Sequence, residues 1–174
     1  MIRRSELAFR TQLVIPEHEQ LYDYWVERAG ERPMPSRGDL HPGHIPKLLP
    51  LVSLIDVERA PARYRFRLVG TRLFDIYGRD LTGAYVDEVD WGQKQDYWAA
   101  AYRRVVEGRR PAQGVVKKPH RNKDHMVQFW LRLPLSEDGE RVTMILSYDT
   151  FVPFTKALRL ADMREDREPI PVHA

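Results

Sequence analysis

The chain has 174 residues, of which 43% are hydrophobic and 30% are charged, a composition typical of one globular domain with terminal additions. Its 28 basic residues against 25 acids leave a formal charge of +3, and the interleaving of acids with bases disfavours nucleic-acid binding. The absence of cysteine excludes disulfides, thiolate nucleophiles and cysteine-ligated metals. No apolar run is long enough for a membrane span and no secretory signal is evident, so we expect a cytoplasmic protein.

The first predicted element is a helix over residues 17–29. Pro16 suits the first turn of a helix, Leu21 and Trp25 recur at helical spacing, and Gly30 follows as a stop. These features together predict an amphipathic helix with an aromatic apolar side.

Two strands are predicted after this helix. A proline-containing crossing over residues 31–41 leads to one or two helical turns within residues 42–49. Residues 51–57 have the apolar character of a buried strand, and residues 64–70 alternate apolar with basic residues. The two strands are separated by a short turn, which predicts a hairpin.

A short helix should follow the second strand directly. Thr71 can act as its N-cap, the apolar residues Leu73, Phe74 and Tyr77 form a stripe, and Gly78 marks its end. We expect the glycines of this region to allow the turns and helix ends of the backbone rather than to contact a ligand.

The second half of the chain predicts one long helix and three strands. Residues 93–107 carry aromatic and small apolar residues at helical spacing. Strands are predicted over residues 112–118, 126–135 and 141–148, and the Asp-Gly pair at 138–139 favours a tight hairpin turn between the last two.

This order of elements predicts an α+β fold. A single five-stranded antiparallel sheet would have the central helices on one face and the N-terminal helix on the other. We divide the chain into an N-terminal extension (residues 1–16), one domain (residues 17–152), and a C-terminal helix and tail (residues 153–174) that is partly disordered.

Both faces of this sheet carry apolar residues. We assign the alternating apolar row of the fourth strand, which contains Phe129 and Leu131, to the face under the central helices. The opposite row is also too apolar for water, so we expect the N-terminal helix, or a second copy of the chain, to cover it. The candidate residues for this contact or for a homodimer are Leu21, Trp25, Leu54, Trp130 and Ile145.

Several specific motifs stand in order along this predicted plan. They are Leu21-Tyr22-Asp23-Tyr24-Trp25, Met34-Pro35-Ser36-Arg37, Leu48-Leu49-Pro50, the strand from Tyr64 to Thr71, and Gly78-Arg79-Asp80-Leu81-Thr82-Gly83. In these motifs the chain resembles the alphaproteobacterial single-domain PAS family, over about residues 20–150. The resemblance implies a sensory or regulatory module of bacterial signalling, with no catalytic residue set and no cofactor that can be carried over.

A PAS-like pocket would lie between the inner face of the sheet and the central helices. The candidate pocket residues are Ile55, Phe66, Leu68, Phe74, Tyr77, Trp98, Tyr102, Phe129, Leu131 and Met144. Two interpretations stay open at this point. These residues could simply fill the core, or they could line a cavity for a small, mostly apolar or aromatic ligand that Tyr77, Trp98 or Tyr102 would orient.

Catalytic motifs are missing from the sequence, which contains no phosphate loop, nucleophile elbow or zinc-binding helix. His41 and His44 lack a third ligand nearby, so no metal site is predicted. The alternative to a PAS sensor is a cone-shaped α+β fold of the nuclear-transport-factor type with isomerase or hydratase chemistry. That alternative needs an inward acid and base, and only Asp56 and Asp149 are carboxylates on or at the end of predicted strands. We therefore expect a protein without enzymatic activity.

The expected partners are a second copy of the chain, a signalling protein and a small molecule. Arg79 and Asp80 are the candidate surface contacts for a protein partner. No output domain fits in the remaining chain, so we expect the signal to pass by direct contact between two surface states.

Overall fold

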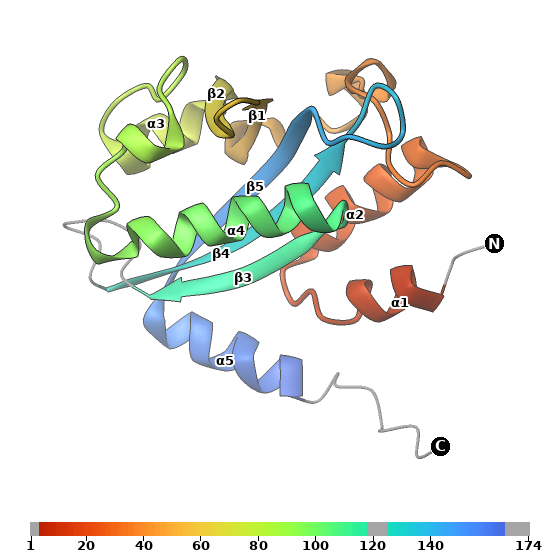
Figure 1. The fold of residues 1–174 in the computed structure, drawn as a ribbon. Coiled ribbons are helices and arrows are strands. Elements are labelled where there is room, and N and C mark those ends of the chain that lie inside the picture. Colours follow the sequence, from red (N-terminus) through yellow and green to blue (C-terminus); the bar gives the residue numbers. More distant parts are fainter. Residues whose placement is uncertain (1–3, 118–124, 166–174) are drawn as a thin grey trace.

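The computed structural model describes residues 4–117 and 125–165. Five antiparallel strands form one sheet in the order β2-β1-β5-β4-β3, so β5 lies in the middle and β2 and β3 form the edges (Figure 1). The strands are β1 Val52–Glu58, β2 Arg63–Val69, β3 Ala112–Lys117, β4 Met126–Leu135 and β5 Met144–Pro153. The predicted α+β class with an antiparallel five-stranded sheet is confirmed.

Helices lie on both faces of this sheet, with α4 across one face and α2 across the other (Figure 1). The helices are α1 Arg4–Arg10, α2 Pro16–Ala29, α3 Thr71–Tyr77, α4 Gln95–Gly108 and α5 Phe154–Glu165. Five single 3-10 turns complete the described chain: η1 Arg37–Asp39, η2 Pro42–His44, η3 Leu49–Leu51, η4 Val86–Glu88 and η5 Gly92–Lys94. In the described part of the chain no helix is long and apolar enough to cross a bilayer. We call the face under α4 the inner face and the face under α2 the outer face.

Helix α2 covers the outer face, as the sequence predicted. Trp25 is buried and its Nε1 donates a hydrogen bond to the Pro134 carbonyl of β4 at 2.9 Å. His18 is buried as well, with its Nε2 atom 3.2 Å from Thr150 Oγ1 of β5. The helix of the same chain therefore covers this face, and a second copy is not needed for that purpose.

Helix α1 was not predicted. It lies against α2, where the rings of Phe9 and Tyr22 have centroids 5.0 Å apart. Arg10 at its end forms a two-pronged ion pair with Asp23, with Nε to Oδ1 at 2.7 Å and Nη2 to Oδ2 at 2.8 Å. Seven residues alone do not form a stable helix in water, so this contact with α2 is what holds α1.

Helix α4 packs on the inner face through Trp130 of β4. Trp130 Nε1 donates to the Tyr97 hydroxyl at 2.8 Å, and the Trp98 and Trp130 ring centroids are 5.8 Å apart. The indole of Trp130 lies flat on Gly114 of β3, where an added Cβ would come within 2.5 Å of the ring. Glycine at this strand position therefore makes room for Trp130, against which α4 packs.

Two of the predicted boundaries shift for local reasons. The last strand begins at Met144 rather than at 141, because Asp138 Oδ1 accepts hydrogen bonds from the amides of Glu140 and Arg141 and keeps them in the turn. Helix α3 starts at Thr71 itself, with Gly70 as its N-cap. The predicted tail at residues 166–174 lies outside the described residues.

The assignment of the two rows of the sheet was wrong. Directly paired residues in an antiparallel sheet share a face. Trp130 pairs with Asp149 and with Gly114, and Trp130 contacts α4, so this row belongs to the inner face. Phe129 and Leu131 alternate with that row and therefore lie on the outer face. The prediction also placed Trp130 and Ile145 on the same face as Leu54, and this was wrong. Ile145 pairs with Ile55 and with Pro134, which lie in the row of Trp130 on the inner face. Leu54 pairs with Leu146, in the row of the outer face.

Candidate functional site

The inner face of the sheet carries a buried polar cluster beneath α4. Arg132 of β4 donates from Nη2 to Asp149 Oδ1 of β5 at 2.9 Å, and Gln128 donates from Nε2 to the same oxygen at 2.7 Å. The exposed fractions of these residues are 3%, 4% and 0%. Charged groups at this depth are stable only when they are paired and hydrogen bonded. The three side chains therefore depend on one another for their place in the core.

Aromatic rings surround the charged end of Arg132. Its guanidinium carbon lies 5.3 Å, 5.4 Å and 5.6 Å from the ring centroids of Trp98, Tyr102 and Trp130. Burial by itself lowers the pKa of Arg132, but the charge and hydrogen bond of Asp149, together with Tyr102 and Tyr77, outweigh this effect and raise the pKa above its usual range. Arg132 therefore stays cationic inside an aromatic shell.

Two tyrosines extend the cluster toward the helices. Burial raises the pKa of Tyr102 on α4, and its contact with Arg132 partly opposes this effect. Burial also raises the pKa of Tyr77 on α3, whose hydroxyl interacts with Gln128. Both hydroxyls are thus neutral donors near pH 7. Together with Asp149 these groups form a continuous polar path from α3 to α4 across two strands.

Several buried polar atoms of this face have no hydrogen-bond partner among the described residues. They are Arg132 Nε, Gln128 Oε1, Trp98 Nε1, Ser53 Oγ and Ser147 Oγ. Ser53 and Ser147 are direct partners on β1 and β5, and Ser147 also pairs with Arg132. Buried polar groups in proteins are nearly always hydrogen bonded, so this concentration of unpaired atoms sets the inner face apart from the outer face.

A cleft of about 410 Å³ opens beside the cluster, between β2, η4 and α4. Tyr64 and Val86 are among the residues of its apolar lining, and Arg63 and Gln95 are among the polar ones. The Tyr64 ring stacks on the Tyr102 ring with centroids 5.2 Å apart. The cleft is therefore one aromatic layer away from the buried cluster.

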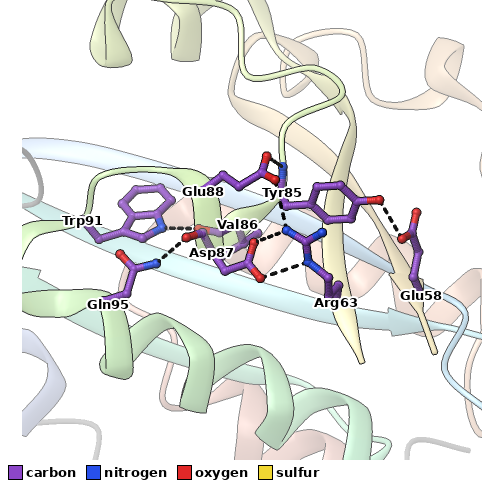
Figure 2. Close-up of polar contacts among 8 residues, drawn as sticks. All are labelled: Glu58, Arg63, Tyr85, Val86, Asp87, Glu88, Trp91 and Gln95. Atoms are coloured by element: carbon purple, nitrogen blue, oxygen red, sulfur yellow. Dashed lines mark hydrogen bonds and ion pairs between the residues drawn. The ribbon is translucent and has the colours of Figure 1, made fainter. Parts of the chain in front are cut away.

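Figure 2 shows an arginine clasp formed by Arg63 and Asp87, two residues that line this cleft. Arg63 of β2 binds both carboxylate oxygens of Asp87, with Nε to Oδ2 at 3.0 Å and Nη2 to Oδ1 at 2.7 Å. Its guanidinium carbon lies 3.5 Å from the Tyr85 ring centroid, and the Tyr85 hydroxyl donates to Glu58 at 2.9 Å. The hydrogen bond from Arg63 lowers the pKa of Asp87. The clasp is exposed to solvent, so its contribution to stability is small.

Turn η4, which contains Asp87, is also hydrogen bonded to α4 and to the segment before it. Gln95 Nε2 donates to the Asp87 carbonyl at 3.0 Å, and Trp91 Nε1 donates to the Val86 carbonyl at 2.7 Å (Figure 2). Turn η4 is thus held between the edge strand and the central helix.

The predicted pocket residues divide into two groups. Those placed on the inner face or on the helices beside it are Ile55, Phe66, Tyr77, Trp98 and Tyr102. Phe129, Leu131 and Met144 were wrongly placed, because the whole alternating row to which they belong lies on the outer face.

Leu68 and Phe74 were also wrongly placed and are 46% and 50% exposed. A register shift between Leu54 and Ile55 pairs Leu68 with Leu54 but Phe66 with Ile55, so the two β2 residues do not share a face. Phe74 lies on the solvent side of the short helix α3.

The predicted partner contacts divide in the same way. Leu21, Trp25, Leu54, Trp130 and Ile145 are all buried inside the single chain, so the prediction that they form a homodimer surface was wrong. Arg79 and Asp80 are exposed as predicted, although Asp80 Oδ1 accepts a hydrogen bond from the Thr82 amide at 2.9 Å. This bond lowers the pKa of Asp80 and gives it a role in the turn.

Sequence reasoning missed the central members of the polar cluster, Gln128 and Arg132, and did not connect them with Asp149. A signal was available, because Gln128, Trp130 and Arg132 alternate along one predicted strand and so share one face. The prediction considered Trp130 of this row but not Gln128 and Arg132. In fact they pair with a carboxylate on the neighbouring strand and are buried together.

Comparison with known families identifies the fold. The family model described as PAS domain matches residues 14–148, most of the chain. The chain belongs to the PAS domain family. This PAS domain is also similar to the crystal structure of a Rhodobacter sphaeroides LOV protein, with 11% identity, a TM-score of 0.47, and coverage of 76% of this chain and 86% of that one. A comparison with curated proteins gave no significant match. Membership of the PAS family favours the PAS interpretation over the cone-shaped alternative.

Proposed function

We propose that this PAS domain is a sensory module without enzymatic activity, which binds a small molecule on the inner face of the sheet and signals to a protein partner by contact. The observation that carries the proposal is the set of unpaired polar atoms around Arg132 and Trp98, buried beneath α4. A ligand with hydrogen-bond acceptors would satisfy the two nitrogen donors, and Gln128 Oε1 would accept one bond from it.

The chemistry of the cluster favours a flat ligand with several polar groups over the mostly apolar or aromatic one considered from the sequence. Aromatic rings from α4 and β4 provide stacking surfaces, whereas Arg132 and the serines Ser53 and Ser147 provide polar contacts along one side. Such a mixture of apolar walls with few oriented polar groups is typical of small-molecule sites.

The same geometry argues against acid–base catalysis. Asp149 Oδ1 accepts bonds from Arg132 and Gln128, and neither partner can act as a proton shuttle near pH 7. Asp56 lies on the outer face, where it forms an ion pair with Arg67 at 3.1 Å. The two carboxylates considered for an enzyme thus lie on opposite faces of the sheet.

A route for the signal starts at the stacked pair Tyr102 and Tyr64. A ligand that moves Tyr102 would shift Tyr64, which lines the cleft next to η4. Turn η4 and the Arg63 clasp would then change the surface that a partner meets. A homodimer and a cytoplasmic location stay predictions, as does the role of Arg79 and Asp80.

The test is native mass spectrometry of the purified protein together with an absorbance scan. We expect a small molecule that copurifies with the wild type and is lost from the double variant Arg132→Met/Asp149→Leu, which removes the buried pair but keeps the packing volume. The matched control Arg67→Met/Asp56→Leu removes an ion pair from the outer face and should retain the ligand. Two results together would contradict the proposal: a wild-type protein that carries no additional mass, and tryptophan NMR signals that do not shift when a bacterial metabolite extract is added.

A further inference from the structure

A second cleft, of about 670 Å³, lies away from the buried polar cluster. It is bounded by α1, by α2 and by the turn that joins α4 to β3. Figure 1 shows α1 on the side of the molecule where β3 begins. Its lining includes Phe9 of α1, Arg104 of α4, Arg110 of the turn, and Gln113 of β3. This cleft has no part in the site proposed above.

The charge of the cleft is strongly one-sided. Three arginines line it, Arg104, Arg109 and Arg110, against one carboxylate, that of Glu6. Arg109 reaches the Glu140 carbonyl at 3.4 Å, but in the described part of the chain neither Arg104 nor Arg110 forms an ion pair. Other arginines, such as Arg10, Arg63 and Arg132, form ion pairs with carboxylates of the same chain. The cleft therefore presents a positive potential that favours an acidic partner.

The floor of the cleft includes a free strand edge. Strand β3 is the last strand of the sheet, and no strand of the described chain pairs with its outer edge. Its first residues, Ala112 and Gln113, line the cleft, and Val115 further along is 39% exposed. An edge strand offers backbone donors and acceptors to which an extended chain can add.

The far wall of the cleft is aromatic. The rings of Phe9, Tyr22 and Trp25 follow one another with centroids 5.0 Å and 6.0 Å apart. Tyr22 and Trp25 are almost fully buried, whereas Phe9 is only partly buried and so offers apolar surface. An apolar side chain that enters the cleft would pack against Phe9.

We infer that this cleft docks an extended acidic segment of a protein partner, which adds to the edge of β3 and places its carboxylates against Arg104 and Arg110. The free strand edge decides in favour of a peptide, because a small anion would use the arginines alone. The inference rests on the proposed function insofar as a PAS sensor needs a partner surface. It names the chemistry of that partner as an acidic chain with an apolar residue among its carboxylates.

The experiment uses a fluorescent synthetic peptide of alternating glutamate and valine residues and the full-length protein. Fluorescence anisotropy should show saturable binding of this peptide and none of its lysine and valine counterpart. The double variant Arg104→Gln/Arg110→Gln should weaken binding by about tenfold or more, because two charge-assisted contacts are lost. The matched control Arg72→Gln/Arg159→Gln removes the same charge from α3 and α5, outside this cleft, and should bind within about twofold of the wild type.

Hydrogen exchange separates strand addition from simple charge attraction. With the acidic peptide bound, the amides of Ala112–Lys117 should exchange more slowly, and those of β2 at the other sheet edge should not change. Binding that depends on the arginines without protection of β3, or equal competition by free glutamate or inorganic phosphate, would overturn the inference. So would equal loss of binding in the two double variants. Because the assay uses no inner-face ligand, its failure leaves the small-molecule proposal untouched.

Discussion

The inner and outer faces of the sheet are both covered by helices, yet they are built from different chemistry. Under α2 the outer face carries leucine, valine and aromatic residues, and the buried His18 of α2 contacts Tyr148 and Thr150 there. Under α4 the inner face carries Arg132, Asp149 and Gln128 within an aromatic shell. Burial alone therefore does not distinguish the two faces. Unpaired buried polar side-chain atoms do, because in the described sheet they lie on the inner-face residues Ser53, Gln128, Arg132 and Ser147.

The largest effect that tests this contrast is the loss of one member of the buried ion pair. Asp149→Leu leaves Arg132 charged without its carboxylate, and Arg132→Met leaves Asp149 in the same condition. Each single change should lower the free energy of unfolding by about 3 to 5 kcal/mol, measured by urea denaturation. The double change should recover most of this loss, because two apolar residues replace a costly buried pair. Strictly additive losses would show that the two charges are not coupled.

A smaller, pH-dependent effect is expected from His18 on the outer face. Burial, together with the positive charge of Arg132, lowers the pKa of His18 from 6.5 to about 3. The unfolded chain then binds a proton below pH 6.5 that the native chain does not bind until about pH 3. Stability due to this group is therefore lost as the pH falls from 6.5 toward 3, with about 2 kcal/mol lost by pH 5.

The comparison of urea unfolding at pH 7.5 and pH 5 in wild type and His18→Gln checks this value. The variant should lack about 2 kcal/mol of the wild-type difference between the two pH values. An unchanged difference would mean that His18 is accessible to water and protonates at its ordinary pKa.

The smallest of the three effects concerns Trp25, which anchors α2 to β4. Trp25→Phe removes the hydrogen bond from Nε1 to the Pro134 carbonyl but keeps most of the aromatic surface. We expect a loss of about 1 kcal/mol in the free energy of unfolding. Trp91→Phe removes a similar bond, from Nε1 to the Val86 carbonyl at 2.7 Å, on the side of α4. The affinity for the inner-face ligand should fall in Trp91→Phe and remain unchanged in Trp25→Phe. The reverse result would mean that the ligand binds on the outer face.

Much of the fold could be predicted from local patterns. The helix that ends before Gly30 and the short helix that ends at Gly78 have the expected bounds at these ends, because both glycines adopt positive φ, 59° and 71°. Strand β4 matches its predicted range of 126–135, since its alternation is long and regular. Helix α1 was missed because its formation depends on contacts with α2 rather than on its own sequence.

The candidate site was predicted only in part. Trp98 and Tyr102 were found because a long amphipathic helix shows its buried side clearly. The pairing of Arg132 with Asp149 was missed because it joins positions 17 residues apart on two strands. The exposure of Leu68 depends on a shift in strand register, which leaves no mark in the alternation of β2 itself.

The sequence by itself determined the order of the elements, the antiparallel sheet and the two rows of side chains on each strand, because these follow from local periodicity and turn residues. Only the tertiary structure decided which row faces α4 and which faces α2. Alternation shows which residues share a face, but when both faces are covered it does not say by what. The row with Arg132 became the inner face because Asp149, Gln128 and the rings of α4 together compensate a charge that neither water nor a purely apolar helix could accommodate there.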